Sequence, residues 1–140
     1  MADATLHLDI ATPERLIVNE QVSEAELPGK DGYLGILPGH APLLSALGAG
    51  VLTYGTGGNR HVLVVDGGFV EVFENHVRVL ADYAERAEEV DTSRARAELE
   101  QATNALKQAH DEAECNAALR AMQKAQARLD GAERAGTRVH

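Results

Sequence analysis

The stretch ADYAERAEEVDTSRARAELEQA, from Ala81 to Ala102, contains the change of pattern that decides the fold. Before Val90 the chain holds all four prolines and eleven of the thirteen glycines, and after it come thirteen alanines in fifty residues. Glycine and proline punctuate short strands and turns, whereas alanine is the strongest helix former. We therefore expect a β-rich piece followed by a helical piece.

Upstream of this stretch, apolar and polar residues alternate with a period of two, which is typical of strands with one buried face. Leu6 to Ile10 is the clearest case. Gly55 to Asn59 and Glu74-Asn75 separate apolar runs as hairpin turns would, and Asp66-Gly67-Gly68 predicts a further turn between strands. Many short strands at this spacing predict an all-β sandwich, a flattened barrel, over residues 1–88.

Downstream, apolar residues recur every three or four positions, the period of a helix. Two such series flank His110-Asp111-Glu112, and so short a connection makes two helices antiparallel. Residues 89–140 therefore predict an α-helical hairpin, capped at its start by Asp91 or Thr92. Gly131 and Gly136 weaken the end of the second helix, and we expect it to fray there. The two series are Ala95, Leu99, Ala102, Leu106 and Ala109, and then Cys115, Ala118, Met122, Ala125, Leu129 and Ala132.

The helical series consist mostly of alanine, which limits how strongly the hairpin can be held. A buried methyl group contributes about 0.8 kcal/mol, against roughly 1.5–3 kcal/mol for a leucine side chain. We expect helices that pack closely but weakly, in a hairpin that can leave its docking surface at modest cost.

The formal net charge of −9 lies entirely on the first ninety residues, which carry fourteen acidic and five basic side chains. A nucleic-acid partner would require a basic face for its phosphates, so we expect none. Cys115 is the single cysteine, which excludes an intrachain disulfide and fits a reducing compartment. Met1 to Thr5 lacks a basic region followed by an apolar run, so no signal peptide is expected.

Motifs of catalysis are absent from the sequence. A phosphate-binding loop would require G-x-x-x-x-G-K-[ST], which does not occur. The six histidines show no i, i+4 pair on a helix and there is no cysteine pair, so the spacing predicts no metal site. His40 and scattered acidic residues are all that supports an unrecognised hydrolase, and we expect no enzyme.

The densest segment, GYLGILPGHAPLL, runs from Gly32 to Leu44. It predicts a strand, a Pro-Gly turn and then an apolar run stiffened by proline. Two interpretations are open: a fixed turn over the core with His40 hydrogen-bonded to backbone, or a surface that faces a partner.

With the preceding aspartate this segment reads D-G-x-L-G-I-L-P-G-H-A-P-L-L, and it resembles the signature of the epsilon subunit of bacterial F-type ATP synthase. Leu6 to Ile10 resembles the family's first strand. Gly67 to Val72 resembles its G-G-x-x-E-V strand, and Val77 to Asp82 its V-x-V-L-A-D strand. The resemblance extends from about residue 5 to about residue 130.

The resemblance implies a β-sandwich of about ten strands followed by a regulatory helical hairpin. The implied function is that of a non-catalytic subunit of the central stalk, on the rotor of the proton-translocating synthase. It would couple proton flow to ATP synthesis, and its extended hairpin would inhibit ATP hydrolysis. The implied partners are the gamma subunit, the ring of c subunits and, in the extended state, the alpha–beta catalytic head. The chain would meet the bacterial plasma (inner) membrane only through the complex, at the cytoplasmic face.

By the same resemblance, two segments would form the interfaces of the sandwich. An uncharged surface shaped by glycine and proline suits a permanent interface, whose buried centre is depleted in charge. The gamma-subunit interface would comprise His40, Ala41, Pro42, Leu43 and Leu44, and the c-ring interface Gly29, Lys30, Asp31, Gly32 and Tyr33.

Some members of the family bind ATP on the folded hairpin through an I/L-D-x-x-R-A motif, for which this chain reads V-D-T-S-R-A. A lysine stands where the family has the first of two arginines four apart, and Gln101 stands in place of a further arginine. Lysine lacks the bidentate fork of arginine and glutamine carries no charge, so ATP, as a regulatory ligand, is expected to bind weakly or not at all. The candidate ATP-binding residues are Glu85, Val90, Asp91, Arg94, Ala95, Lys124 and Arg128.

Structural roles explain the same residues without a nucleotide. Asp91 is suited to cap a helix, and Arg94 with Glu98 is suited to an i, i+4 ion pair. Lys124 and Arg128 could equally form a solvated helix face. If the candidate residues do bind ATP, a free-standing ATP-sensing regulatory module is the alternative function.

Overall fold

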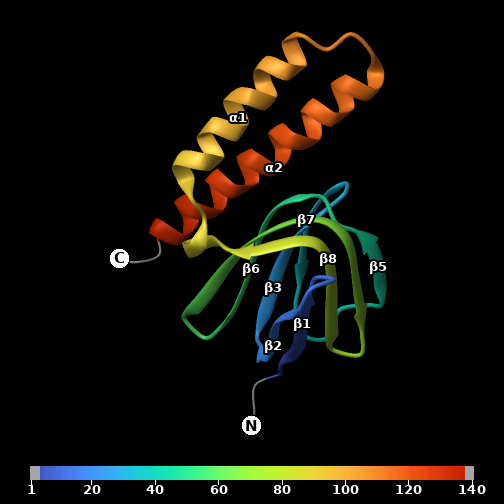
Figure 1. Cartoon of the computed structure of the whole chain (residues 1–140). Helices are drawn as coiled ribbons and strands as arrows, with labels where there is room; N and C mark the ends of the chain where they lie inside the picture. Colours follow the sequence, from blue (N-terminus) through green and yellow to red (C-terminus); the bar gives the residue numbers. More distant parts are fainter. Residues whose placement is uncertain (1–3, 138–140) are drawn as a thin grey trace.

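The computed structural model describes residues 4–137, which form eight strands, a short 3₁₀ helix and two α-helices (Figure 1). The predicted β-sandwich followed by an α-helical hairpin is confirmed. The elements are β1 (Leu6–Ala11), β2 (Leu16–Val22), β3 (Glu24–Gly29), β4 (Gly32–Ile36), β5 (Leu43–Ala46), β6 (Ala49–Thr56), β7 (Asn59–Phe73), β8 (His76–Arg86), η1 (Ala87–Glu89), α1 (Thr92–Lys107) and α2 (Glu112–Thr137).

The strands follow the order β2-β1-β8-β7-β6-β3-β4, with β5 paired to β7 outside this path. All the named pairings are antiparallel except that of β1 with β8, which is parallel. Glu74 and Asn75 form the predicted tight turn between β7 and β8, with φ of +48° and +61°. Residues 4–137 thus contain eight strands, fewer than the ten or so that the family resemblance implies.

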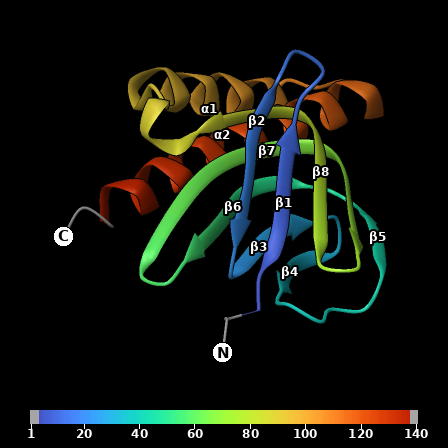
Figure 2. The ribbon, with the colours of Figure 1, turned by 90° about the horizontal axis from the view of Figure 1, so that it is seen from below.

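The chain has fewer strands than expected because two long strands, β7 and β8, each run through both layers of the sandwich. β7 pairs with β6 as far as Asp66 and with β5 from Phe69 onward, while β8 pairs with it on both sides of this point. Figure 2 shows β7 curving across the molecule between β6 and β5. One continuous strand therefore occupies the place of two shorter ones.

The predicted turn at Asp66-Gly67-Gly68 is wrong, because these residues lie inside β7. Gly67 and Gly68 have φ of +74° and +105°, values that glycine adopts readily and other residues avoid. The pairing continues from Asp66 opposite Tyr83 to Gly68 opposite Ala81, so the strand bends without ending. A glycine bend and a glycine turn have the same local composition, which is why the pattern did not separate them.

The main core lies inside the curled sheet, and a smaller cluster of Val51, Val62 and Ala87 lies under Ala135 of α2. The predicted alternation of β1 is confirmed, because Leu6, Leu8 and Ile10 are fully buried while the residues between them are half-buried. They join inward-facing residues of the other strands, including Leu52 and Leu63. These side chains dominate the stability of the sandwich, at roughly 1.5–3 kcal/mol each.

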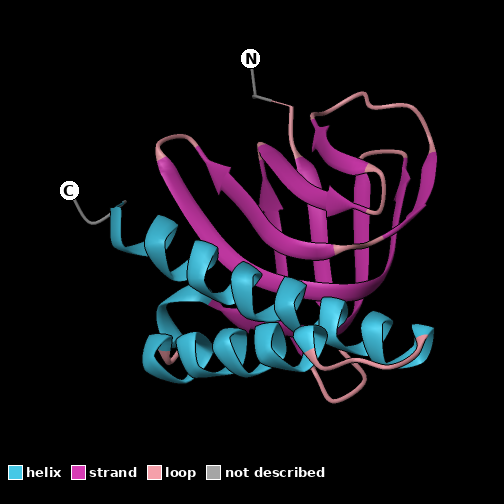
Figure 3. Cartoon of the chain, turned by 90° about the horizontal axis from the view of Figure 1, so that it is seen from above, coloured by secondary structure: helices cyan, strands magenta, loops and turns pink. Residues whose placement is uncertain are grey.

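The two helices lie together on one outer face of the sandwich (Figure 3). α2 packs on β6, β7 and η1, whereas α1 packs chiefly on α2. The predicted alanine seam is present. Its buried members are Ala95, Ala102, Ala118 and Ala125, and Ala127 is buried as well.

The expectation that α2 frays around Gly131 and Gly136 is wrong for the described residues, because the helix passes both glycines and continues to Thr137, and the residues after Thr137 lie outside the described part of the chain. Gly131 is buried on the side of α2 that packs on the sheet. A Cβ placed on it would lie 2.5 Å from Val64 Cγ2 and 3.6 Å from Ala87 Cβ. Gly131 therefore permits close packing, and the contact more than offsets its low helix propensity.

Within residues 4–137, neither helix combines the length and the apolar character needed to cross a membrane.

Candidate functional site

The start of α1 is fixed by Asp91. Its Oδ1 accepts a hydrogen bond from the backbone N–H of Arg94 at 3.1 Å, and Thr92 is already the first helical residue. The guanidinium of Arg94 lies 3.9 Å from Glu98, one helical turn later, and remains largely exposed. Both residues therefore have the structural roles that their spacing suggests.

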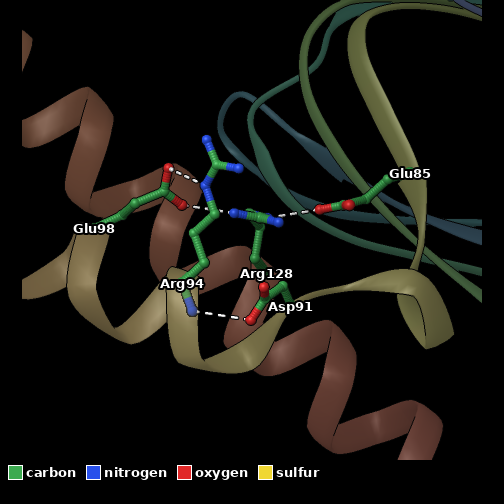
Figure 4. A network of polar contacts seen from close by, with 5 residues as sticks. All are labelled: Glu85, Asp91, Arg94, Glu98 and Arg128. Carbon is green, nitrogen blue, oxygen red and sulfur yellow. Dashed lines mark hydrogen bonds and ion pairs between the residues drawn. The ribbon is translucent and has the colours of Figure 1, made fainter.

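Arg128 of α2 joins three elements of the structure (Figure 4). Its Nε donates to Glu85 Oε1 of β8 at 2.7 Å, and its Nη1 donates to Glu98 Oε1 of α1 at 2.6 Å. Its side chain is only 12% exposed, so the interpretation of a solvated face is wrong for Arg128. Burial would lower the pKa of Arg128, but the hydrogen bond and charge of Glu85 outweigh it and raise the pKa.

This ion-pair network holds the hairpin against the sandwich. Charge-assisted hydrogen bonds are stronger than neutral ones, and arginine can make two of them in a fixed geometry. Removing one member of a buried pair leaves a charge without its counterion, which is more destabilising than loss of a surface pair. Glu85 and Arg128, from the candidate ATP set, are thus brought into direct contact.

Lys124 lies one turn before Arg128 on α2. Its Nζ is 3.9 Å from the ring centroid of Tyr83, within the range of a cation–π interaction. Burial raises the pKa of the Tyr83 phenol, and the nearby Glu85 carboxylate raises it further. Tyr83 therefore stays neutral at physiological pH and offers its ring face to the lysine.

A cavity of about 800 Å³ lies between the two helices and β8. Three of the candidate ATP-binding residues line it, namely Arg94, Lys124 and Arg128. The other four candidates, Glu85, Val90, Asp91 and Ala95, are not part of the lining, and Ala95 is fully buried in the alanine seam. The remaining lining residues are Tyr83, Glu98, Gln101, Ala102, Ala105, Glu114, Ala117, Ala118, Ala121 and Ala125.

The cavity fits a nucleotide only in part. Apolar methyl groups could contact a base, and Arg94 and Lys124 could meet phosphate oxygens. Arg128, however, already satisfies two carboxylates, and Gln101 contributes no charge. A triphosphate would therefore rely on Arg94 and Lys124.

The segment from His40 to Leu44 has two different halves. The His40 ring Nδ1 lies 2.7 Å from the carbonyl oxygen of Ala41, and the backbone N–H of Gly39 donates to Asn75 Oδ1 at 2.7 Å. The turn is thus fixed to the β7–β8 hairpin, as the first interpretation expected. Past Pro42 the chain enters β5, where Leu43 packs on the core and Leu44 points outward.

Leu44 belongs to a group of exposed apolar side chains on the outer surface of β5, β7 and β8, which we call the apolar face. The pairing register places Leu44 opposite Glu71, and Phe69 opposite Leu80, on the same side of the sheet. The apolar face consists of Leu44, Phe69, Phe73 and Leu80, which are 72, 58, 54 and 54% exposed.

Three members of the apolar face were missed from the sequence. Phe69 and Phe73 flank the buried Val70 and Val72, so this part of β7 is apolar on both sides. This departure from alternation could have indicated the apolar face in the sequence, because a strand with one solvent-exposed face should carry polar residues at positions 69 and 73.

The segment from Gly29 to Tyr33 forms the turn between β3 and β4, with Lys30 and Asp31 exposed at its tip. The backbone N–H of Lys30 donates to the carbonyl of Ala46, at the far end of β5 from His40. The hydroxyl of Tyr33 accepts from the backbone N–H of Val51 at 3.0 Å. The structure therefore separates the two candidate interface segments by the length of β5.

A cluster that the sequence did not reveal joins His7 and Asp9 of β1 to His76 of β8. The Nε2 atoms of His76 and His7 lie 2.6 Å and 3.2 Å from the two carboxylate oxygens of Asp9. Burial alone would raise the pKa of Asp9, but the hydrogen bond from His76 and the proximity of both histidines hold it below its ordinary value. Sequence spacing missed the cluster because the parallel pairing of β1 with β8 is not local.

Comparison with known proteins assigns the chain to a family. The sequence family described as ATP synthase, delta/epsilon chain, β-sandwich domain matches residues 5–87. The ATP synthase epsilon chain of Solibacter usitatus is 56% identical over 133 residues, covering 93% of this chain and 97% of that relative. The epsilon chain of Nitratidesulfovibrio vulgaris (strain DP4) is 44% identical over 127 residues, covering 91% and 95%.

The likeness extends to solved structures. A chain in the cryo-EM structure of the Euglena gracilis mitochondrial ATP synthase (OSCP/F1/c-ring, rotational state 1) aligns with a TM-score of 0.81 at 26% identity. The alignment covers 92% of this chain and 81% of that chain, so it includes sandwich and hairpin together. The chain therefore belongs to the ATP synthase epsilon chain family, whose members are accessory rather than catalytic subunits.

Proposed function

We propose that this chain is a central-stalk subunit of a proton-translocating F-type ATP synthase, where it couples proton flow to ATP synthesis. The observation that carries the proposal is 56% identity to an epsilon chain over nearly the full length of both proteins. The complex would place the chain at the cytoplasmic face of the bacterial plasma membrane, with no membrane contact of its own.

We propose the apolar face as the contact for the gamma subunit. Exposed apolar groups that gather on one surface mark interaction sites, and this one, in which Glu71 and Arg78 lie between the apolar side chains, includes Leu44 of the sequence-based candidates. The exposed turn at Lys30 and Asp31 is proposed to meet the c ring. His40 and this turn lie toward opposite ends of β5, but the apolar face reaches the Ala46 end through Phe69, so the two proposed contact surfaces adjoin.

We propose that the hairpin inhibits ATP hydrolysis when it leaves the sandwich and extends toward the alpha–beta catalytic head. The docked state is held by the packing of α2 on β6, β7 and η1, where Gly131 lies close to Val64, and by the ion pairs of Arg128 with Glu85 and of Arg134 with Glu26. All of these contacts come from one helix, α2, which supports an equilibrium between a docked and an extended position.

Leu44→Asp with its control tests the proposed gamma contact, and a truncated chain tests the role of the hairpin. Leu44→Asp is expected to weaken association with the gamma subunit at least tenfold, because it places a second charge beside Glu71 within the proposed contact. Leu119→Asp is the matched control, since Leu119 is an exposed leucine on α2 outside the apolar face.

A chain ending at Val90 is expected to fold, to bind gamma and to raise ATP hydrolysis by the assembled enzyme.

Pull-down with gamma and the steady-state hydrolysis rate of the reconstituted enzyme measure these effects. Equal binding by the Leu44 and Leu119 variants would contradict the proposed interface. Unchanged hydrolysis with the truncated chain would contradict the inhibitory role of the hairpin.

A second proposal is regulatory nucleotide binding in the interhelical cavity, favoured by the convergence of Arg94 and Lys124 there. We expect calorimetry with Mg-free ATP to give weak binding, with an affinity in the millimolar range. Lys124→Gln should weaken it about tenfold, the effect of losing one charged hydrogen bond. Arg120→Gln is the control, because Arg120 is exposed on α2 and does not line the cavity. No heat at millimolar ATP removes this proposal.

A further inference from the structure

The cluster of His7, Asp9 and His76 lies on the outer surface of the sheet, away from the hairpin. His7 and His76 are direct partners in the parallel pairing of β1 with β8, and Asp9 follows two residues after His7 on the same side. Two strands that are sequentially remote therefore bring three potential metal ligands together on one rigid surface. Neither the hairpin nor the apolar face uses these residues.

The three side chains converge rather than merely lie near one another. Both imidazoles direct Nε2 toward the Asp9 carboxylate, one nitrogen to each oxygen. One ligand atom from each residue can be chosen so that all lie within 4.8 Å of one another. The rings meet edge to face, with centroids 5.0 Å apart. Asp9 is 18% exposed and the histidines 34 and 38%, so the cluster is partly covered and open to water on one side.

One atom of the cluster is incompletely satisfied. Asp9 Oδ1 is buried and accepts no well-directed hydrogen bond, although His7 Nε2 lies 3.2 Å away. Buried carboxylate oxygens normally have a partner, and one that lacks it calls for an explanation. A cation between the carboxylate and the imidazoles would supply that partner.

We propose that His7, Asp9 and His76 form a binding site for a divalent transition-metal ion of the Zn²⁺ class, with water as the fourth ligand. Two imidazoles and one carboxylate suit Zn²⁺, whereas Mg²⁺ and Ca²⁺ prefer oxygen ligands alone. Bonds near 2.1 Å in a tetrahedron place ligand atoms about 3.4 Å apart. His76 Nε2 and Asp9 Oδ2, at 2.6 Å, need to separate by less than 1 Å, which side-chain rotation allows.

The neighbouring strand β2 supplies a supporting group. The Gln21 amide lies 2.9 Å from His7 Nδ1, and Thr5 Oγ1 lies 2.9 Å from the same amide. When Nε2 binds a metal, Nδ1 carries the proton and needs an acceptor. Rotation of the Gln21 amide by 180° would present its oxygen to Nδ1 and its nitrogen to the Thr5 hydroxyl. This arrangement would fix the ring orientation that metal binding requires.

The competing interpretation is a hydrogen-bonded network that joins β1 to β8 and binds nothing. In that case His76 donates to Asp9 and the cluster contributes only to stability. The two interpretations differ in their response to the metal itself, which can be measured without gamma and without the assembled enzyme. The result is therefore independent of the proposed function.

The test is calorimetric titration of the full chain, freed of metal, with ZnCl₂ in a buffer that does not chelate. We expect one equivalent of Zn²⁺ to bind. His7→Gln, His76→Gln and Asp9→Asn should each weaken binding tenfold or more, and Gln21→Ala by about tenfold, as supporting residues do elsewhere. His110→Gln and Cys115→Ser are the matched controls outside the cluster, and both should change the affinity less than twofold.

Folding of each variant is checked by its circular dichroism spectrum and by thermal unfolding without metal. Zn²⁺ should raise the melting temperature of the unaltered chain and leave that of His76→Gln unchanged. Absence of saturable binding would establish the hydrogen-bonded network and overturn the proposal. Equal affinity in the unaltered chain and in His76→Gln would overturn it as well, by placing the bound metal elsewhere.

Discussion

Gly68→Ala is expected to destabilise the sandwich severely, because the added methyl group would meet backbone atoms rather than a flexible side chain. A Cβ on Gly68 would overlap the carbonyl oxygen of Leu80 and lie 2.9 Å from Ala81 Cα, both in β8. Its φ of +105° adds backbone strain that a side chain cannot avoid. Strain and overpacking each cost about 1–3 kcal/mol, so we expect the free energy of unfolding to fall by roughly 2–6 kcal/mol.

Urea denaturation followed by circular dichroism measures this loss, since the chain contains no tryptophan. Gly35→Ala is the matched control, because a Cβ there has nothing within 4 Å and its φ is not in the left-handed region. We expect the control to change the free energy of unfolding by about 0.5 kcal/mol or less. Equal stability of the two variants would show that β7 does not need its glycine bend.

Gly131→Ala is expected to release the hairpin while leaving the sandwich folded. The new Cβ would lie 2.5 Å from Val64 Cγ2, a buried atom that cannot move aside freely. Relief requires α2 to shift away from the sheet, and overpacking of this kind costs about 1–3 kcal/mol. The hairpin is docked through one helix and the ion pair of Arg128 with Glu85, so a cost of this size should undock a measurable fraction of molecules.

Limited proteolysis of the segment around Val90 reports the undocked fraction, because a released hairpin exposes its connection to β8. Val64→Ala in the same chain should restore docking by removing the clashing methyl groups, a coupling that a double-mutant cycle quantifies. Gly136→Ala is the control, since nothing lies within 4 Å of its Cβ and alanine favours the helix. Equal cleavage of Gly131→Ala and Gly136→Ala would contradict the assigned role of Gly131.

The sequence predicts those features of the structure that depend on neighbours along the chain. The alternation in β1, the turn at Glu74-Asn75 and the cap at Asp91 are each local, and each is present. The helical period also locates the alanine seam. These features depend on residues that are close in sequence, and the tertiary contacts of the folded chain agree with the local preference at each of them.

Features that depend on remote contacts were not predictable in this way. Gly68 and Gly131 look like breakers of structure in the sequence, yet each makes room for another element. Phe73 looks like a core residue but faces outward. The pairing of His7 with His76 depends on a parallel contact between the first and last strands, which no short-range pattern encodes.

The two carboxylates that bind Arg128 differ in whether they move with it when the hairpin undocks. Glu98 belongs to the hairpin and travels with Arg128 wherever α2 goes, whereas Glu85 stays behind on β8. Loss of the contact between Arg128 and Glu85 alone therefore indicates that the hairpin has undocked intact. Loss of the contacts to both Glu85 and Glu98 indicates that its two helices have also separated. The two contacts of the Arg128 guanidinium thus distinguish rigid-body release of the hairpin from unfolding of the hairpin. Spectroscopic labels at the two glutamates would report these two events independently.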